Sequence, residues 1–316
     1  MSTRRASSFV HGCDPGRRRR AKAVRAAAVA VLVVVAAVGA TGCGVEDGTT
    51  GGAHRGAGPN ERQTLRGNVV VSAAASLTDV FEELADRFER AHPGVRVDLD
   101  AGSSTALATR ILEGAPADVF ASADPASMER VESAGLVERP HAFAGNELAI
   151  VTRPGNPHGI TGLADLAGHR SAGGRTPFAG AERHSGSRGS GEGVGVGIVA
   201  LCAESAPCGR YTAALLERSG VTIPEGSITR GQDARATLAA VAEGDAAAGV
   251  VYRSDARAAG DRVATVDIAG ADAVRAEYLI AAVRNSRHRD VARSFVDLVR
   301  SDEGRSLLED AGFTRP

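Results

Sequence analysis

The hydrophobic period changes in the middle of residues 69–91, and this change constrains the fold more than any other feature of the sequence. Residues 69–72 form a β-branched run typical of a buried strand, whereas the apolar residues between Leu77 and Phe88 recur at helical spacing. A strand must therefore pass into a helix across residues 73–76, which are small. The carboxyl end of a strand and the start of a helix meet there.

The start of this helix carries a hydroxyl group and a carboxylate. Ser76 followed by Asp79 predicts a capping box, in which the two side chains satisfy free backbone N–H groups. A hydroxyl beside first-turn N–H groups can also bind an anion, although an ordinary capped helix has the same pattern. The same arrangement of strand, serine-containing turn and helix start occurs a second time. An alternating strand at residues 95–99 is followed by Ser103, and a helix is predicted over 104–113.

Strands and helices alternate along the rest of the chain. Further strands are predicted at 118–121, 147–151, 198–202, 247–252, 263–268 and 278–283, and further helices at 125–134, 163–166, 210–219, 233–243, 291–299 and 305–311. This alternation predicts α/β layers with largely parallel sheets, which bind ligands at the carboxyl ends of their strands. The length of the chain predicts two such lobes around a cleft.

Residues 1–42 have the pattern of an export signal. A basic segment that includes arginines 17–20 precedes an Ala/Val-rich run at 26–40, which is too short to span a bilayer comfortably. The run ends at Ala40-Thr41-Gly42-Cys43, which resembles the lipobox of bacterial lipoproteins and predicts that Cys43 carries lipid. Because alanine replaces the usual leucine of that motif, a plain cleaved signal is the alternative. The small residues before Cys43 disfavour a retained signal anchor.

Residues 43–67 are rich in Gly, Thr and charged residues without hydrophobic period, which predicts a flexible tether. The whole chain has a formal net charge of −1, and the leader is strongly basic, so the exported part is acidic. Nucleic acid is therefore not an expected partner, since phosphate neutralisation needs a basic face. A bound anion must be held by local donors.

Two of the four cysteines fall in the exported domain. Cys202 and Cys208 close a small loop, which in an exported protein favours a disulfide. Their spacing matches no common metal motif, and no metal cation site is predicted. Residues 171–197, rich in Gly and Ser, are expected to form an exposed insertion, because their glycines lack nucleotide-loop spacing and no strand precedes them.

Five segments resemble, in this order, the molybdate-binding proteins of bacterial ABC importers, the ModA family. The resemblance covers residues 68–170 and 198–316, and the segments are AAASLTDVFEELADRFE, GSSTALATRILEGAPADVFASADPASMERVESAGLV, ELAIVTRPGNP, VALCAESAPCGRYTAALLERSGV and AGVVYRSDA. It implies the type II periplasmic-binding-protein fold, an α/β fold in which two lobes joined by crossing strands hold one oxyanion in the cleft between them. The first lobe is expected at 68–145 and 253–316, and the second at 146–252.

Carried over residue by residue, the resemblance implies five ligand-binding positions. Ser76 and Ser103 would supply hydroxyl and backbone N–H groups, Cys208 and Ala234 would supply backbone N–H groups at helix starts, and Tyr252 would supply its phenol. Each has an ordinary alternative: a helix cap for the serines, a disulfide partner for Cys208, a good helix residue at Ala234 and a core aromatic for Tyr252. Their occurrence together, in the family's order, favours the binding role.

These neutral donors suit a tetrahedral dianion. Hydroxyl groups, peptide N–H groups and helix N-termini each form charge-assisted bonds worth about 1.5–3 kcal/mol. A rigid cage of such donors can measure ion size, so a cage fitted to molybdate leaves the smaller sulfate with stretched bonds. A phosphate site typically adds a carboxylate to accept the remaining proton. None of the five positions is acidic, although Asp79 and Asp233 lie close to them in sequence.

The resemblance implies an extracytoplasmic, lipid-anchored monomer, not an enzyme, that binds molybdate or tungstate without a cofactor and delivers it to an ABC permease with its ATPase subunit. One alternative is a binding protein for another tetrahedral oxyanion, such as sulfate, thiosulfate or phosphate. A second is an exported hydrolase with a serine nucleophile. The sequence contains no G-x-S-x-G motif, and its eight histidines are scattered without an H-x3-H pair, which disfavours the hydrolase.

Overall fold

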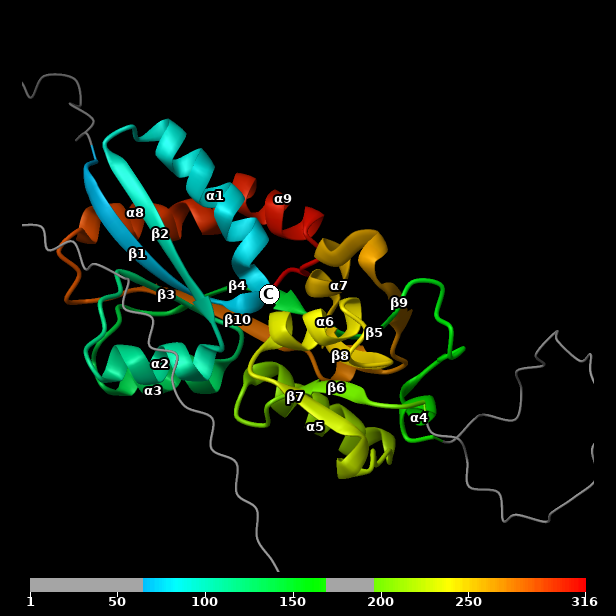
Figure 1. Ribbon diagram of the computed structural model, residues 1–316. Helices are drawn as coiled ribbons and strands as arrows, with labels where there is room; N and C mark the ends of the chain where they lie inside the picture. The colour runs from blue at the N-terminus through cyan, green and yellow to red at the C-terminus, as the bar shows by residue number, and fades with distance from the viewer. Residues whose placement is uncertain (1–64, 169–195) are drawn as a thin grey trace, which may run out of the picture. The chain divides into compact units, whose positions relative to one another are not determined.

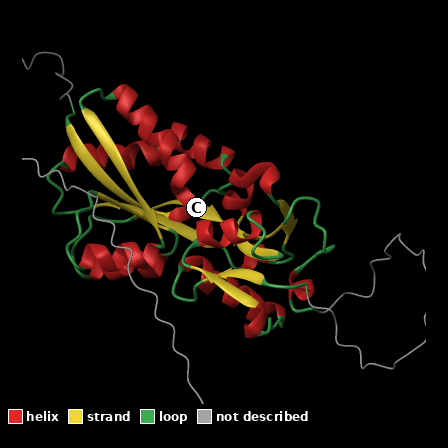
Figure 2. Ribbon diagram, viewed as in Figure 1, coloured by secondary structure: helices red, strands yellow, loops and turns green. Residues whose placement is uncertain are grey.

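The computed structural model describes residues 65–168 and 196–316, which form two five-stranded sheets flanked by helices (Figures 1 and 2). The predicted signal at 1–42, the lipid site Cys43, residues 43–64 of the tether and residues 171–195 of the insertion lie outside the described residues. Within the described ranges, no helix is long and apolar enough to cross a membrane.

The first sheet has the strand order β2-β1-β3-β10-β4. Strand β1 runs parallel to β2 and β3, whereas β10 runs antiparallel to β3 and β4. The strands are β1 (Gly67–Ala74), β2 (Val95–Gly102), β3 (Val119–Ser122), β4 (His141–Asn146) and β10 (Ala276–Ala282). We call this sheet and its helices the first lobe.

Helices cover both faces of the first sheet (Figure 1). The helices are α1 (Thr78–Ala91), α8 (Arg289–Arg300) and α9 (Asp302–Asp310) on one side, and α2 (Ser104–Leu112) and α3 (Pro125–Ser133) on the other. Phe81 and Phe88 of α1 pack edge-on against Phe295 of α8, while Phe120 of β3 packs with Met128 of α3 on the opposite face. Burying one such side chain contributes about 1.5–3 kcal/mol, so these contacts fix the helices on the sheet.

The second sheet has the strand order β7-β6-β8-β5-β9, with β6 parallel to β7 and β8, and β5 antiparallel to β8 and β9. We call this sheet and its helices the second lobe. Its strands are β5 (Leu148–Thr152), β6 (Val199–Cys202), β7 (Ile228–Gly231), β8 (Ala248–Tyr252) and β9 (Ala264–Asp267), and its helices are α4 (Leu163–Leu166), α5 (Pro207–Ser219), α6 (Ala234–Ala242) and α7 (Arg253–Ala259). The 3-10 helices are η1 (Ala75–Leu77), η2 (Glu225–Ser227), η3 (Gly260–Arg262) and η4 (Ala271–Ala273).

The two-lobed α/β fold predicted from the sequence is confirmed, and two of its details differ. The sheets are mixed rather than largely parallel, because the chain crosses between the lobes from β4 to β5 and from β9 to β10, and one antiparallel strand enters each sheet this way. The chain also returns to the first lobe after residue 267, later than the predicted boundary at 252. It returns late because α7 packs on the second sheet and β9 pairs with β5.

Candidate functional site

Helix starts from both lobes meet around one small pocket. The space between its walls, including the open mouth, is about 220 Å³. All five positions predicted from the sequence line it: Ser76 and Ser103 from the first lobe, and Cys208, Ala234 and Tyr252 from the second. The pocket therefore has the size of a site for a small ligand, with walls supplied by both lobes.

Three of the helices that begin at the pocket have no side-chain cap among the described residues. These are η1, α2 and α5, whose N-cap residues are Ala74, Ser103 and Ala206. The first N–H groups of a helix have no partner within the helix, so a start without a cap needs a partner from elsewhere. Together with the helix dipole, such free N–H groups form an anion-binding site.

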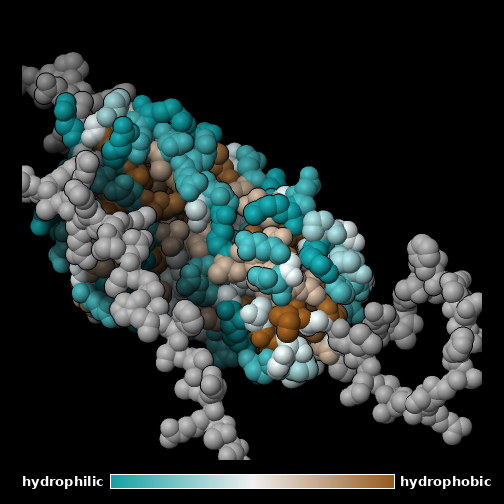
Figure 3. Space-filling model, viewed as in Figure 1, coloured by the Kyte–Doolittle hydropathy of each residue, from teal (hydrophilic) through white to brown (hydrophobic). Residues whose placement is uncertain are grey.

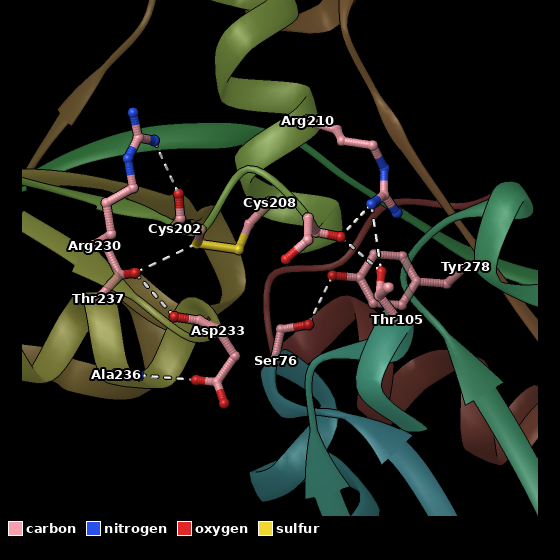
Figure 4. The surroundings of a disulfide bond; sticks show 11 residues. Ser76, Thr105, Cys202, Cys208, Arg210, Arg230, Asp233, Ala236, Thr237 and Tyr278 are labelled. Atoms are coloured by element: carbon pink, nitrogen blue, oxygen red, sulfur yellow. Dashed lines mark hydrogen bonds between the residues drawn. A yellow bond between two sulfur atoms is a disulfide. The ribbon is translucent and has the colours of Figure 1, made fainter. Parts of the chain in front are cut away.

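Helix α6 begins at the pocket with its third N–H group already satisfied. The Asp233 carboxylate, at the N-cap position, accepts a hydrogen bond of 2.9 Å from the backbone N–H of Ala236 (Figure 4). Ala234 is the first residue of the helix, 3% exposed, and lines the pocket. Its N–H is a first-turn donor that the helix itself cannot satisfy.

The two neighbouring serines at the start of α2 have different roles. The Ser104 hydroxyl oxygen accepts a bond of 3.0 Å from the N–H of Ala123, which ties the helix to the end of β3. Ser103 is half-buried and lines the pocket, and in the described part of the chain its hydroxyl makes no helix-capping bond. Ser103 thus has no capping bond, whereas Ser104, which also lines the pocket, uses its oxygen as an acceptor and keeps its hydrogen for a ligand.

A disulfide joins Cys202, at the end of β6, to Cys208, the second residue of α5 (Figure 4). The next residue, Gly209, lies so close to the preceding turn that a Cβ atom there would be 2.0 Å from the Ala203 carbonyl oxygen. The bond and the close approach together fix the start of α5 against the end of the strand. The Cys208 N–H is therefore held at the pocket wall by covalent geometry.

The predicted capping box of Ser76 and Asp79 is wrong. Helix α1 begins at Thr78 with Leu77 as N-cap, and Ser76 lies in the preceding 3-10 helix η1. The Ser76 hydroxyl oxygen is 2.7 Å from the hydroxyl oxygen of Tyr278, a buried residue of β10 (Figure 4). The side chain turns from the backbone to Tyr278 because the tighter 3-10 turn moves Ser76 out of the N-cap position.

Tyr278 orients the Ser76 hydroxyl. The Asn146 amide donates to the Tyr278 oxygen over 3.4 Å, and burial raises the pKa of the Tyr278 phenol well above 10, so the phenol keeps its proton. Tyr278 can then donate to Ser76, which leaves the Ser76 hydrogen for the pocket. Sequence reasoning missed Tyr278. The sequence signal for Tyr278 was a tyrosine at the start of the apolar run at 279–283, where a buried hydroxyl needs a hydrogen-bond partner.

Tyr252 supplies a hydroxyl whose bonding capacity is unused. The residue is 2% exposed, lines the pocket at the end of β8, and packs against the Tyr278 ring with centroids 5.9 Å apart. Its hydroxyl oxygen is buried and has no hydrogen-bond partner among the described residues. Burial raises the pKa of this phenol well above 10, so the group remains an O–H donor. A buried donor without a partner costs about 1–3 kcal/mol, which a ligand in the pocket would recover.

Ion pairs connect the lobes beside the pocket. Arg210 of α5 pairs with Asp124, the N-cap of α3, and Arg235 of α6 pairs with Asp79 of α1. The Thr105 hydroxyl also donates to the Ser205 carbonyl across the lobes over 2.7 Å. Both arginines are thus matched by carboxylates of the opposite lobe, and the donors predicted at the pocket wall are neutral.

A larger hollow beside α5 and β7 is not lined by helix-start donors from both lobes. Figure 3 shows hydrophobic residues gathered over this part of the second lobe. The hollow is lined by apolar residues such as Leu216, Ile223 and Ile228, by the carboxylates of Glu204 and Glu225, and by Arg230, which pairs with both carboxylates. It is less suited to an anion than the pocket between the lobes. The described residues contain no group of three or more His, Cys, Asp or Glu side chains that could hold a metal ion.

Comparison with known proteins gives the family. A sequence profile described as "Bacterial extracellular solute-binding protein" matches residues 69–314. The chain belongs to this family. The resemblance found in the sequence is confirmed, since the curated "Molybdate-binding protein ModA" of Mycobacterium tuberculosis is 34% identical over 250 residues, covering 79% of this chain and 85% of that protein.

Solved structures of binding proteins share the fold. The periplasmic molybdate-binding protein of Azotobacter vinelandii aligns with a TM-score of 0.62 at 17% identity, over 78% of this chain and 99% of that one. The sulfate-binding protein SubI of Mycobacterium tuberculosis aligns with a TM-score of 0.61 at 18% identity, over 78% and 86% of the two chains. At these identities the structures support the solute-binding fold alone.

The first prediction tests the backbone donor of Ala234 in this solute-binding protein. Ala234→Pro should remove one N–H while leaving the fold intact, because proline is tolerated as the first residue of a helix and Asp233 before it is extended. Losing a hydrogen bond to a charged ligand should weaken binding roughly 10- to 150-fold, measured by calorimetry. Ala234→Ser keeps the N–H and serves as the control. Unchanged affinity in a folded proline variant would show that this N–H does not contact the ligand.

The second prediction concerns the disulfide. Replacing both cysteines, Cys202→Ala with Cys208→Ala, keeps every backbone N–H but frees the start of α5. The bonded residues are six apart, so the free energy of unfolding should fall by about 2 kcal/mol. Ligand affinity should fall too, because the Cys208 N–H is no longer fixed. Denaturant titration and calorimetry measure the two effects, and mass spectrometry of the non-reduced exported protein should find no free thiol at these positions.

Proposed function

We propose that this extracytoplasmic solute-binding protein captures molybdate and delivers it to an ABC-type import permease. The observation that carries the proposal is the convergence of neutral donors from both lobes on one small pocket. Ser76 and Ser103 supply hydroxyl groups, Cys208 and Ala234 supply helix-start N–H groups, and Tyr252 supplies a buried hydroxyl without a partner. The similarity to the mycobacterial ModA over most of both chains supports the choice of ion.

The chemistry of the ion fits these donors. Molybdate is a tetrahedral dianion at neutral pH, and its four oxygens accept hydrogen bonds on all sides without having a proton to donate. Each charge-assisted bond contributes about 1.5–3 kcal/mol, and the starts of α2, α5 and α6 add positive potential. Neutral donors can therefore hold the charge without a contacting arginine or lysine. Tungstate has the same shape and charge and is proposed as a second ligand.

Sulfate is the second candidate, because the same neutral donor set suits any fully deprotonated tetrahedral anion. A rigid pocket distinguishes the two ions by size, since the smaller sulfate cannot reach every donor at its best distance. Phosphate, which keeps a proton at neutral pH, needs an acceptor in addition. The Asp233 carboxylate lines the pocket and one of its oxygens already accepts the Ala236 N–H, so phosphate belongs in the same titration.

The third prediction is selective, one-to-one binding of molybdate and tungstate. The ion at 100 times its dissociation constant should stabilise the fold by about 2.7 kcal/mol, seen as a raised melting temperature. Calorimetric titration with molybdate, tungstate, sulfate and phosphate gives the ranking. Equal shifts with molybdate and sulfate at the same low concentration would contradict the assignment to molybdate. Turnover of ester substrates by the purified protein would instead favour the hydrolase alternative.

We further propose that the protein acts as a monomer tethered by lipid at Cys43, with residues 43–64 as the linker; residues 65–67 of the predicted tether belong to the folded domain, since β1 begins at Gly67. A short apolar run that ends at a small-residue cysteine supports the anchor. A tether of this kind keeps the binding domain within reach of a permease and its ATPase subunit in the same membrane. No catalytic step is part of this function, and no cofactor is needed.

The fourth prediction tests the anchor. Cys43→Ala should release the protein into the medium or block processing of the signal, because the acceptor thiol is absent. Membrane and medium fractions are compared by immunoblot, and metabolic labelling with a radioactive fatty acid reports the lipid directly. The Cys202→Ala, Cys208→Ala double variant, which keeps Cys43, is the control and should stay in the membrane fraction. Equal membrane retention of the Cys43→Ala protein would show that the anchor lies elsewhere.

A further inference from the structure

Buried polar atoms without partners gather in one region beside the pocket. The described residues contain five buried side-chain nitrogen or oxygen atoms that lack a hydrogen-bond partner. Four of them belong to three residues: Nε of Arg235, the hydroxyl oxygen of Tyr252, and both carboxylate oxygens of Asp255. Such atoms are uncommon in folded proteins, and the Tyr252 hydroxyl is assigned to the ligand. The Asp255 carboxyl still needs an explanation.

Asp255 lies in the first turn of a helix that begins at the pocket. It is the third residue of α7, the helix whose N-cap is the pocket residue Tyr252, and it is 1% exposed. The backbone N–H of Tyr252 faces the carboxylate and lowers its pKa, but neither carboxylate oxygen has a well-formed hydrogen bond among the described residues. A buried carboxylate with so little compensation reduces the cost of its charge by keeping its proton. Burial accordingly raises the pKa of Asp255 from 3.8 to about 7, close to physiological pH.

The one nearby cation is drawn to a different carboxylate. Arg235 of α6 lowers the pKa of Asp255, but its guanidinium pairs with Asp79 on the opposite lobe while its Nε has no partner in the described structure. Because Asp79 and Arg235 belong to different lobes, this pair forms only when the lobes are together. In this arrangement the Arg235 guanidinium bonds Asp79 and acts on Asp255 through its charge alone, without a hydrogen bond.

The remaining groups that face Asp255 are negative or neutral. The titratable and charged groups that act on it from the elements around it are Arg235 of α6, Asp233 at the α6 N-cap, Asp79 of α1, Tyr252 of β8 and Tyr278 of β10. Strand β5, which also packs on α7, carries no titratable side chain, and Arg253 of α7 itself pairs with Asp267 of β9. Asp255 thus faces two carboxylates and one arginine that is already paired, while the two phenols stay neutral.

We propose that Asp255 takes up one proton from solvent when the anion binds, so that anion capture is coupled to protonation of this carboxyl. The inference rests on the proposed function, because a dianion bonded to the Tyr252 hydroxyl places two negative charges beside Asp255. Like charges in a buried site disfavour the ionised form. The proton forms an O–H bond at a carboxylate oxygen of Asp255. The complex with protonated Asp255 then has one negative charge fewer than the complex with ionised Asp255. In the complex, the bound ion therefore lies near a neutral carboxyl rather than a carboxylate.

The fifth prediction is proton uptake by the wild-type protein. Molybdate is titrated calorimetrically in buffers of different ionisation enthalpy, at about pH 8 and about pH 5.5. Close to one proton per ion should be taken up at the higher pH, where free Asp255 is mostly ionised, and close to none at the lower pH, where it is already protonated. Affinity should weaken by up to about tenfold per pH unit above about pH 7. Wild-type binding without proton uptake at about pH 8 would overturn the inference.

A matched pair of variants assigns the proton. Asp255→Asn keeps the shape of the side chain without a titrating group, so its affinity should not change with pH and should exceed that of the wild type at about pH 8. Glu138→Gln is the control, because Glu138 pairs with Arg293 away from the pocket and its pKa is lowered, so it stays charged throughout. This control should keep the wild-type pH profile.

The outcomes separate the two proposals. An Asp255→Asn protein that binds molybdate with the wild-type pH profile would assign the proton to another group and overturn the role of Asp255. A wild-type protein that gives neither binding heat nor a melting shift with molybdate at either pH would overturn the proposed function, and this inference with it. If Asp255→Asn does not fold, the number of protons taken up by the wild-type protein still tests whether anion binding is coupled to proton uptake.

Discussion

The site depends on a property of every helix, namely that its first N–H groups have no partner within the helix. Most helices satisfy these groups with a capping side chain or with water. In the described structure α4 and α8 also begin without a side-chain cap, but η1, α2 and α5 are distinguished by beginning together at the pocket between the lobes. The fold thus gathers unsatisfied donors at one point, and an anion is the partner that satisfies several of them together. The sheets, the disulfide and the tyrosines keep this arrangement in place.

Rigidity at the pocket comes from contacts that do not touch the ligand. The disulfide from Cys202 to Cys208 holds the start of α5, and the Ser104 hydroxyl holds the start of α2 against β3. Asn146 and Tyr278 orient Ser76 by hydrogen bonds from two different strands of the first sheet. Preorganised donors do not have to be ordered when the ion arrives, so more of each hydrogen bond's energy appears as affinity. Fixed donors also allow the pocket to distinguish ions by size.

Local sequence patterns predicted the helices that carry the site, but not the contacts that orient its side chains. Asp233 before Ala234 gave the start of α6 correctly, because an N-cap is decided by neighbouring residues. Ser76 followed the same pattern, yet its hydroxyl bonds Tyr278, which is 202 residues away in sequence. The short strand β4, HAFAGN, was not predicted because it lacks an alternating pattern, and α7 was missed although it begins at the pocket and carries Asp255 in its first turn. Pairings and burial across such distances depend on the tertiary fold, which no local pattern contains.

The distribution of charge bears on the proposed binding of a dianion, because the described residues place no unpaired arginine or lysine among those that line the pocket. The arginines nearest the pocket, Arg210 and Arg235, pair with Asp124 and Asp79 of the opposite lobe. Partly exposed pairs of this kind contribute on the order of 0–1 kcal/mol each, whereas each bond to the ion contributes about 1.5–3 kcal/mol. The ion pairs can align the lobes. Their summed contribution is smaller than that of several hydrogen bonds to an ion, so they could not replace those bonds. In the proposed function, the ion therefore contributes more to holding the lobes together than these ion pairs do. A permease that separated the lobes would break the ligand bonds of one wall and release the ion in the same movement.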